Sequence, residues 1–141
     1  MEPMPLNESD WALVEAAREV LRRTYRPPHH TVAAAVRCGS GKIFTGVNVD
    51  AAAGYGPCAE PVAIGSAFAN GETQVLAIVA VCKRSDELPV LSPCGNCRQL
   101  LFDYAPDATV IYCENGTCVK TAARNLLPGA YVRNSVFNGG Q

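Results

Sequence analysis

Cys58-Ala59-Glu60 and Pro93-Cys94-Gly95-Asn96-Cys97-Arg98 are the two motifs that indicate most about how this chain folds. The first cysteine of each lies where a loop or a strand end meets a predicted helix, and these helices run over 58–70 and 94–104. Cys97 follows Cys94 by about one turn, so these two thiols share one helix face. Two parallel helices that meet at their N-terminal ends would bring all three sulfurs together. The two stretches therefore predict a pair of neighbouring helices with a thiol cluster at one end.

The flanking sequence predicts further strands and helices. Apolar residues recur at spacings of three and four over 9–26, which indicates an amphipathic helix. The segment 75–82 is apolar throughout, as expected of a central strand covered on both faces. The other expected elements are strands over 32–38, 42–49, 109–113 and 118–120, a hairpin turn at Asn115-Gly116, and a short helix over 122–127. This order predicts an α/β fold in which helices cover both faces of one mixed sheet.

Size and charge limit the possible functions. A chain of 141 residues with 48% hydrophobic content suits one domain, which we expect to span 1–141 with flexible ends at 1–8 and 135–141. The net charge of −1 shows no polycationic character, whereas a protein that grips several phosphates usually presents a basic face. We therefore expect a small, nearly neutral substrate and no nucleic acid polymer as a partner.

The N-terminus and the cysteines indicate the cellular context. Residues 1–10 lack the basic and apolar regions of a secretion signal. The longest apolar run, 75–82, is far shorter than the roughly 20 residues that span a bilayer. The seven cysteines are an odd number without secretory context, which indicates reduced thiols, some of them metal-bound. These features predict a cytoplasmic protein with no membrane partner.

Three thiols and one carboxylate in this spacing have the composition of a zinc-dependent nucleobase deaminase site. Three thiolate ligands leave the fourth tetrahedral position of Zn²⁺ open to water, as in catalytic zinc sites. Glu60 lies two residues after Cys58 and projects from another side of the helix, where it can shuttle protons to and from that water. The positive ends of both helices offset the negative charge of the cluster. Arg98 can donate a hydrogen bond to a thiolate.

Other interpretations of the cysteines stay open. A Cys-x-x-Cys pair by itself also occurs in redox-active sites and as half of a structural zinc site, so a non-catalytic zinc or redox module is the alternative from another class. We expect the remaining cysteines to fill apolar space on strands or, for the last, to start a hairpin strand, although one could supply a fourth ligand. They are Cys38, Cys82, Cys113 and Cys118. His29 and His30 follow a double proline and are expected on the surface or at a pocket rim.

Six segments carry a resemblance that extends beyond the cysteines. They are GKIFTGVNV (41–49), GPCAE (56–60), AIGSA (63–67), LSPCGNCRQ (91–99), DYAPD (103–107) and YVRN (131–134). Over about residues 10 to 134 the chain resembles the cytidine deaminase family, and within that family it looks most like the blasticidin-S deaminases.

The resemblance implies a three-layer α/β/α fold with a mixed five-stranded sheet whose last two strands are antiparallel. It also implies a homotetramer with active sites near subunit contacts. One Zn²⁺ per chain would be held by Cys58, Cys94 and Cys97. Glu60 would be the proton donor and acceptor, and the backbone amide of Ala59 would contact the pyrimidine carbonyl.

Two positions depart from the nucleoside deaminases of this family. In those enzymes the residue two after Asn48 is Glu, and the pair holds the ribose hydroxyls, whereas here the second residue is Asp50, one methylene shorter. Blasticidin S carries an unsaturated sugar without those hydroxyls, so its enzymes need not keep the pair. Arg usually follows the catalytic Glu, whereas Pro61 stands here, which leaves charge compensation for the thiolates to Arg98 and the helix ends.

The sequence therefore predicts a hydrolase of the C–N bonds of cyclic amidines. Its reaction would be the hydrolytic deamination of the cytosine ring of a small nucleoside-like substrate, giving the uracil form and ammonia. Blasticidin S is the first choice of substrate. Cytidine or deoxycytidine, as in pyrimidine salvage, is the alternative, because Asn48 and Asp50 could still hold a ribose. Editing of polynucleotides is disfavoured by the lack of a basic face.

Overall fold

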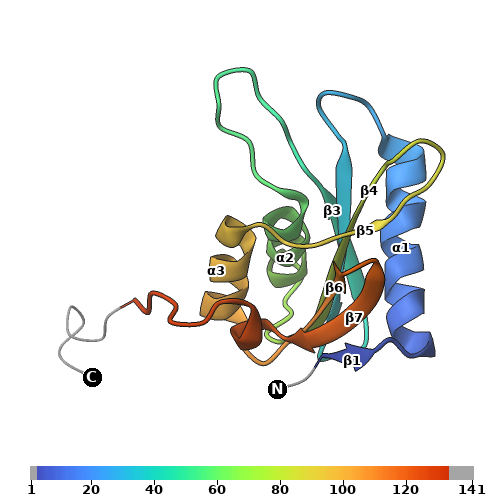
Figure 1. Ribbon diagram of the computed structural model, residues 1–141. Helices are drawn as coiled ribbons and strands as arrows, with labels where there is room; N and C mark the ends of the chain where they lie inside the picture. The colour runs from blue at the N-terminus through green and yellow to red at the C-terminus, as the bar shows by residue number, and fades with distance from the viewer. Residues whose placement is uncertain (1–2, 134–141) are drawn as a thin grey trace.

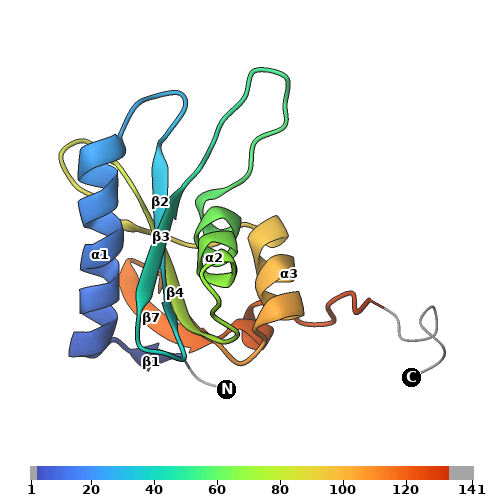
Figure 2. The same ribbon diagram turned by 180° about the vertical axis from the view of Figure 1, so that it is seen from behind.

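The computed structural model of the protein describes residues 3–133, and a mixed sheet forms its middle layer. Helix α1 (Glu8–Thr24) covers one face of this sheet, and helices α2 (Ala59–Ala69) and α3 (Gly95–Tyr104) cover the other (Figures 1 and 2). The strands run in the order β1-β7-β6-β4-β2-β3, with β5 paired to β4 off this path. The β4–β6 pair is parallel and the other pairs are antiparallel. The expected three-layer α/β/α architecture is confirmed.

Within residues 3–133 the sheet has seven strands, and the expectation of five was wrong in this detail. Five strands match the expected segments: β2 (Val32–Cys38), β3 (Ile43–Val47), β4 (Val75–Cys82), β6 (Thr109–Glu114) and β7 (Thr117–Ala122), the last leading into a short 3₁₀ helix, η1 (Ala123–Leu126). The two additional strands are β1 (Met4–Pro5) and β5 (Val90–Leu91). Strands of two residues are too short to show an alternating pattern, so sequence periodicity cannot reveal them.

Strand β1 lies within 1–8, the stretch that the sequence predicts as a flexible end. Met4 and Pro5 pair with Lys120 and Val119 of β7. Proline is tolerated there because β1 is an edge strand, where one side of the backbone needs no ladder partner. The other expected flexible end, 135–141, lies outside the described residues.

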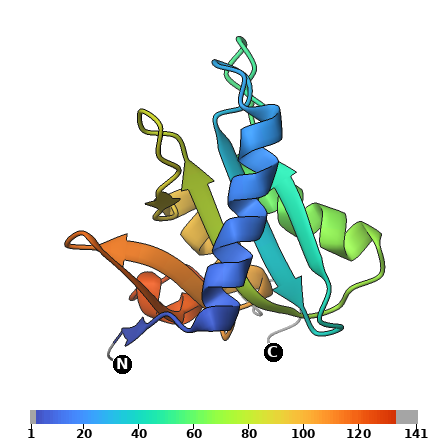
Figure 3. The same cartoon turned by 90° about the vertical axis from the view of Figure 1, so that its right-hand side faces the viewer.

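Helix α1 begins with a capping box and lies across the sheet (Figure 3). Asn7 Oδ1 accepts a hydrogen bond from the Asp10 amide, and Asp10 Oδ2 accepts one from the Asn7 amide, each at 2.9 Å. The ammonium of Lys120 on β7 donates to the same Asp10 oxygen at 2.6 Å, and both side chains of this ion pair are largely buried. The start of α1 is therefore tied to the strand that β1 joins. The apolar core of this layer contains Leu13, Val14, Ala17, Leu21, Ala33, Ala35, Val79, Val81 and Ile111.

Helix α2 packs very close to the sheet because its inner face is built of alanines. Ala59, Ala63 and Ala67 recur every four residues and are fully buried. On the strand side, β3 meets the helix with Gly46, where an added Cβ would lie 2.5 Å from the backbone nitrogen of Ala63. Among the described residues, none of the helices has the length and the apolar character that a membrane span requires.

Replacing Gly46 by alanine should therefore destabilise the protein. The new methyl group would overlap the α2 backbone, and overpacking of this kind costs about 1–3 kcal/mol. Denaturant unfolding should show this loss in the free energy of unfolding. Gly65→Ala is the matched control, because Gly65 is exposed on the same helix and an added Cβ meets nothing within 4 Å. The control should raise the unfolding free energy by up to about 1 kcal/mol, since alanine favours the helix. Equal effects of the two variants would contradict the close packing.

Candidate active site

The three thiols of the two cysteine motifs meet at one point. Cys58 and Cys94 are the N-cap residues of α2 and α3, both with extended backbone, and Cys97 lies one turn into α3. Figure 2 shows the two helices side by side, with their N-terminal ends toward the same end of the molecule. The sulfur atoms of the three residues all lie within 4.8 Å of one another. The structure therefore confirms the predicted cluster, and its geometry suits a single metal ion.

Charge explains why this cluster favours a cation. Backbone amides of Cys97 and Asn96, at the N-terminus of α3, lower the pKa of the Cys94 thiol. Burial raises the pKa of Cys58, and burial together with Glu60 and the other two cysteines raises the pKa of Cys97 well above its usual range. Three thiolates and a carboxylate so close together repel one another. A thiophilic divalent cation would relieve this repulsion, and three sulfur donors are a ligand set that zinc accepts.

Glu60 lies beside the cluster, in the first turn of α2. Its side chain is buried, and its Oε1 accepts a hydrogen bond from the Cys97 thiol over 3.6 Å. Burial is the main cause that raises the pKa of this carboxyl. A carboxyl with a raised pKa gives up and takes back a proton near neutral pH more readily than an exposed one does. Its position and its chemistry are those of an acid–base group next to a metal site.

A cavity of about 380 Å³ opens over the thiols. This volume falls within the range of small-molecule sites, about 300–1,000 Å³. Its lining brings together seven of the eight site residues expected from the sequence, namely Asn48, Asp50, Cys58, Ala59, Glu60, Cys94 and Cys97. The lining also includes Val32, Gly56, Pro57, Leu91 and Ser92, which sequence reasoning did not select as site residues. Four of these residues flank the cysteine motifs, and this nearness in sequence could have indicated that they line the site. They are Gly56, Pro57, Leu91 and Ser92.

Asn48 has its side chain fixed by the start of β2. Its Oδ1 accepts hydrogen bonds from the amides of Thr31 at 2.7 Å and Val32 at 2.9 Å, and its Nδ2 donates to Thr31 Oγ1 at 3.3 Å. Nδ2 carries two hydrogens, and within residues 3–133 Thr31 Oγ1 accepts one of them while no acceptor is found for the other. Asn48 also lines the cavity.

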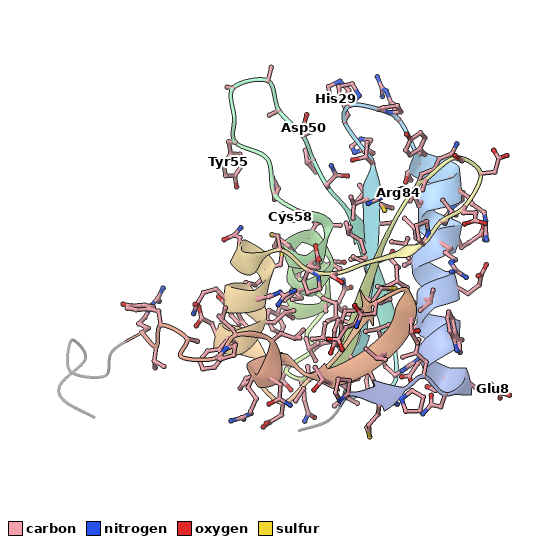
Figure 4. All side chains as sticks on the ribbon, in the orientation of Figure 1. Glu8, His29, Asp50, Tyr55, Cys58 and Arg84 are labelled. Atoms are coloured by element: carbon pink, nitrogen blue, oxygen red, sulfur yellow. The ribbon has the colours of Figure 1, made fainter. Side chains whose placement is uncertain are left out.

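Asp50 lies at the rim of the cavity, where two loops run side by side (Figure 4). Its amide donates to the His29 carbonyl at 3.2 Å, and its carbonyl faces His29 Nδ1 at 3.4 Å. His30 Nδ1 lies 2.9 Å from the Asn48 carbonyl oxygen. The two histidines thus brace the loop that carries Asn48 and Asp50. Among the described residues, the grouping of potential metal ligands contains the three cysteines and neither histidine.

The hydrogen bonds of Arg98 differ from the expected one to a thiolate. Its Nε donates to the Pro93 carbonyl at 2.8 Å and its Nη1 donates to the Leu126 carbonyl at 3.1 Å, so these hydrogen bonds go to backbone oxygens and not to a thiolate. The guanidinium therefore joins the turn before Cys94 to η1. A planar group with several fixed donors suits this bridging role. Compensation of thiolate charge by Arg98 stays a prediction.

Comparisons with known proteins agree with this site. The family model "Cytidine and deoxycytidylate deaminase zinc-binding region" matches residues 7–113. A blasticidin-S deaminase from Bacillus cereus is 42% identical over 140 residues, which cover 95% of this chain and 100% of that protein. A cytidine deaminase from Halalkalibacterium halodurans is 32% identical over 84% of this chain and 91% of its own length. The crystal structure of cytidine deaminase from Burkholderia pseudomallei has a TM-score of 0.72 at 33% identity, covering 89% of this chain and 100% of that one.

The match to the family model includes both cysteine motifs, and the thiol cluster provides the expected zinc ligands. Removal of an amino group from a cytosine ring by water breaks a C–N bond of a cyclic amidine. By sequence, fold and site, the chain belongs to the cytidine and deoxycytidylate deaminase family, whose members are hydrolases of such bonds.

Proposed function

We propose that this protein deaminates the cytosine ring of a small nucleoside-like molecule, with blasticidin S as its first substrate. The observation that carries the proposal is a buried carboxyl, Glu60, hydrogen-bonded to the Cys97 thiol at the base of a cavity of about 380 Å³. The choice of blasticidin S is supported by the 42% identity to the Bacillus cereus blasticidin-S deaminase over the whole length of that protein.

The chemistry divides between a metal and Glu60. Zinc held by Cys58, Cys94 and Cys97 would supply the Lewis acidity that makes water nucleophilic near neutral pH. Glu60 accepts the proton of the water that adds to C4 of the ring and delivers it to ring N3. It then takes the remaining proton from the hydroxyl group on C4 and passes it to the amino group, so that the C4–N bond breaks as the C4=O bond forms. One cytosine ring and one water thus give one uracil ring and one ammonia. The raised pKa of Glu60 lets one carboxyl serve both as acceptor and as donor.

The cavity wall would orient the substrate. Ala59 is the first residue of α2, so its amide belongs to the helix end whose N–H groups have no partner within the helix. We assign this amide to the ring carbonyl. The second hydrogen of Asn48 Nδ2 would donate to an oxygen of the sugar.

Cytidine or deoxycytidine is the second candidate substrate. Asn48 and Asp50 both line the cavity, and a carboxylate at position 50 can accept a hydrogen bond from a ribose hydroxyl. The 32% identity to a cytidine deaminase supports the same alternative. The net charge of −1 argues against a polynucleotide substrate.

We also propose a homotetramer, on the basis of the family resemblance. Such contacts could use exposed apolar side chains near the C-terminal end of α3, namely Tyr104, Tyr131 and Val132. Light scattering should give the mass of four chains, and a monomer mass at micromolar concentrations would contradict the proposal.

Cys94→Ala should lose zinc. Removal of one of three ligands from a site at the helix ends weakens metal binding, and the fold is expected to weaken with it because metal binding and folding are coupled. Elemental analysis should find one zinc per chain in the unaltered protein and far less in the variant. Cys82→Ala is the control, since Cys82 lies at the end of β4, outside the cluster, and its zinc content should be unchanged. Full zinc in Cys94→Ala would refute the ligand assignment.

Glu60→Gln should keep zinc and fold but lose nearly all turnover. General acid–base groups contribute about 10²–10⁴-fold, and we expect the upper end because one carboxyl serves several proton transfers. Steady-state release of ammonia measures the loss, and Glu87→Gln, on a loop away from the cavity, should keep the original rate. A Glu60→Gln rate above roughly a tenth of the original, a barrier change of less than about 1.4 kcal/mol, would exclude the proton-shuttle role.

Asp50→Ala separates the two candidate substrates. Loss of a charged hydrogen-bond acceptor costs about 1.5–3 kcal/mol, so cytidine turnover should fall roughly 10–150-fold if Asp50 holds a ribose hydroxyl. Blasticidin S, which lacks those hydroxyls, should be nearly unaffected. Both rates are measured by the absorbance change of the ring on the same preparation. Equal losses for the two substrates would mean that Asp50 only shapes the loop before Cys58.

A further inference from the structure

Cys113 and Cys118 face each other across the β6–β7 hairpin. They are direct cross-strand partners, and their Sγ atoms lie 2.8 Å apart. The turn between the strands consists of Asn115 and Gly116, whose φ angles of 53° and 80° are both positive. Such two-residue turns match the twist of the flanking strands and hold the register firmly. The hairpin therefore keeps the two sulfurs together without any help from the zinc cluster.

The backbone of Cys113 shows that this pair occupies a non-hydrogen-bonded position of the ladder. Its amide donates to Ser92 Oγ at 3.2 Å, and its carbonyl accepts from the same hydroxyl at 3.1 Å, so both groups point away from β7. At such positions the Cα atoms of antiparallel partners are about 4.5 Å apart, and the side chains approach more closely than at hydrogen-bonded positions. A disulfide needs Cα atoms about 4.4–6.8 Å apart. The two thiols can therefore be joined with little movement of the backbone.

The surroundings of the pair differ from those of the zinc cluster. Both side chains are half-buried and pack against the core beneath α1, whereas Cys58, Cys94 and Cys97 belong to the ends of α2 and α3 on the opposite face of the sheet. Figure 3 shows the hairpin turn at the edge of the molecule, beside α1 and not beneath it. The two thiols are half-buried rather than fully buried and do not line the cavity, so a small reagent can reach them without entering it.

We propose that Cys113 and Cys118 form a redox-active dithiol, which small disulfides such as oxidised glutathione convert into an intrachain disulfide. The Cys118 sulfur attacks one sulfur of the small disulfide, forms a mixed disulfide and releases one thiolate. The Cys113 sulfur then attacks Cys118 in this mixed disulfide, closes the Cys113–Cys118 bond and releases the second thiolate. The two protein thiols lose two protons and two electrons, and the small disulfide takes up both to become two thiols.

The 2.8 Å contact between the two sulfurs makes one thiol the hydrogen-bond donor and leaves the other as the first attacker. Burial and the neighbouring Cys118 raise the pKa of the Cys113 thiol to about 12, so this thiol is protonated near neutral pH and can donate to the Cys118 sulfur. Only a short segment, 114–117, separates the two cysteines. Closing so short a loop removes little entropy from the unfolded chain, so the disulfide is not a major structural staple and can be reduced again.

Oxidation of the zinc-loaded protein with oxidised glutathione tests the proposal. After the remaining thiols are alkylated in denaturant, trypsin cuts after Arg98 and Lys120, and a Glu-specific protease cuts after Glu114. Residues 99–114 then carry Cys113 alone, and residues 115–120 carry Cys118 alone. Mass spectrometry should find these two peptides joined, with the intact protein lighter by two hydrogens and its zinc content unchanged.

Variants provide the controls for this experiment. Cys118→Ser and Cys113→Ser should each abolish the joined peptides, whereas Cys82→Ser, which changes a half-buried thiol outside the pair, should leave them unchanged. Phenylarsine oxide, which binds two neighbouring thiols, should protect the reduced pair from oxidation. Any of three results would overturn the proposal: both thiols stay reduced, glutathione stays on Cys118 without closing the bond, or the cysteines of the zinc cluster are oxidised first. Mass spectrometry of the joined peptides does not depend on deamination. The experiment therefore tests the redox-active dithiol separately from the proposed function.

Discussion

The meeting of two helix N-termini over one face of the sheet is the constraint on which the site depends. Three sulfur atoms within 4.8 Å require α2 and α3 to approach closely at the same end. The approach of α2 to the sheet is possible because alanines line its inner face and Gly46 leaves room for its backbone. The helices then place Cys58 and Cys94 at their first turns, and Cys97 follows from the helical repeat. The packing of small residues thus determines the geometry of the site.

The same helix ends supply part of the electrostatic balance. Backbone amides at the start of α3 stabilise the Cys94 thiolate, while burial and mutual repulsion oppose ionisation of Cys58 and Cys97. A cluster of this kind is stable when its thiols are protonated or when a metal cation binds to them. Binding of zinc would displace the protons, and Glu60, buried next to Cys97, would remain as the group able to exchange a proton with the substrate. Arg98 supports the arrangement by bonding the backbone before Cys94 to η1.

Local patterns in the sequence predicted most of this structure. The two helix starts, the apolar strand β4 and the Asn115-Gly116 turn each leave a signal within a few residues, and the structure confirms them. The contacts that were missed join residues distant in sequence. β1 pairs with β7 across more than a hundred residues, Arg98 reaches Leu126, and Ser92 bonds to Cys113. Such contacts depend on how the layers pack, so the spacing of residues along the chain does not reveal them.

Three thiolates would hold one zinc and leave its fourth position open beside Glu60. X-ray absorption at the zinc edge of the purified protein tests this arrangement, because it distinguishes sulfur neighbours from lighter ones. We expect three sulfur neighbours and one lighter neighbour for each zinc, and this pattern should persist in Cys82→Ala. Four sulfur neighbours would indicate a closed structural site and would refute this arrangement, as would a zinc without sulfur neighbours.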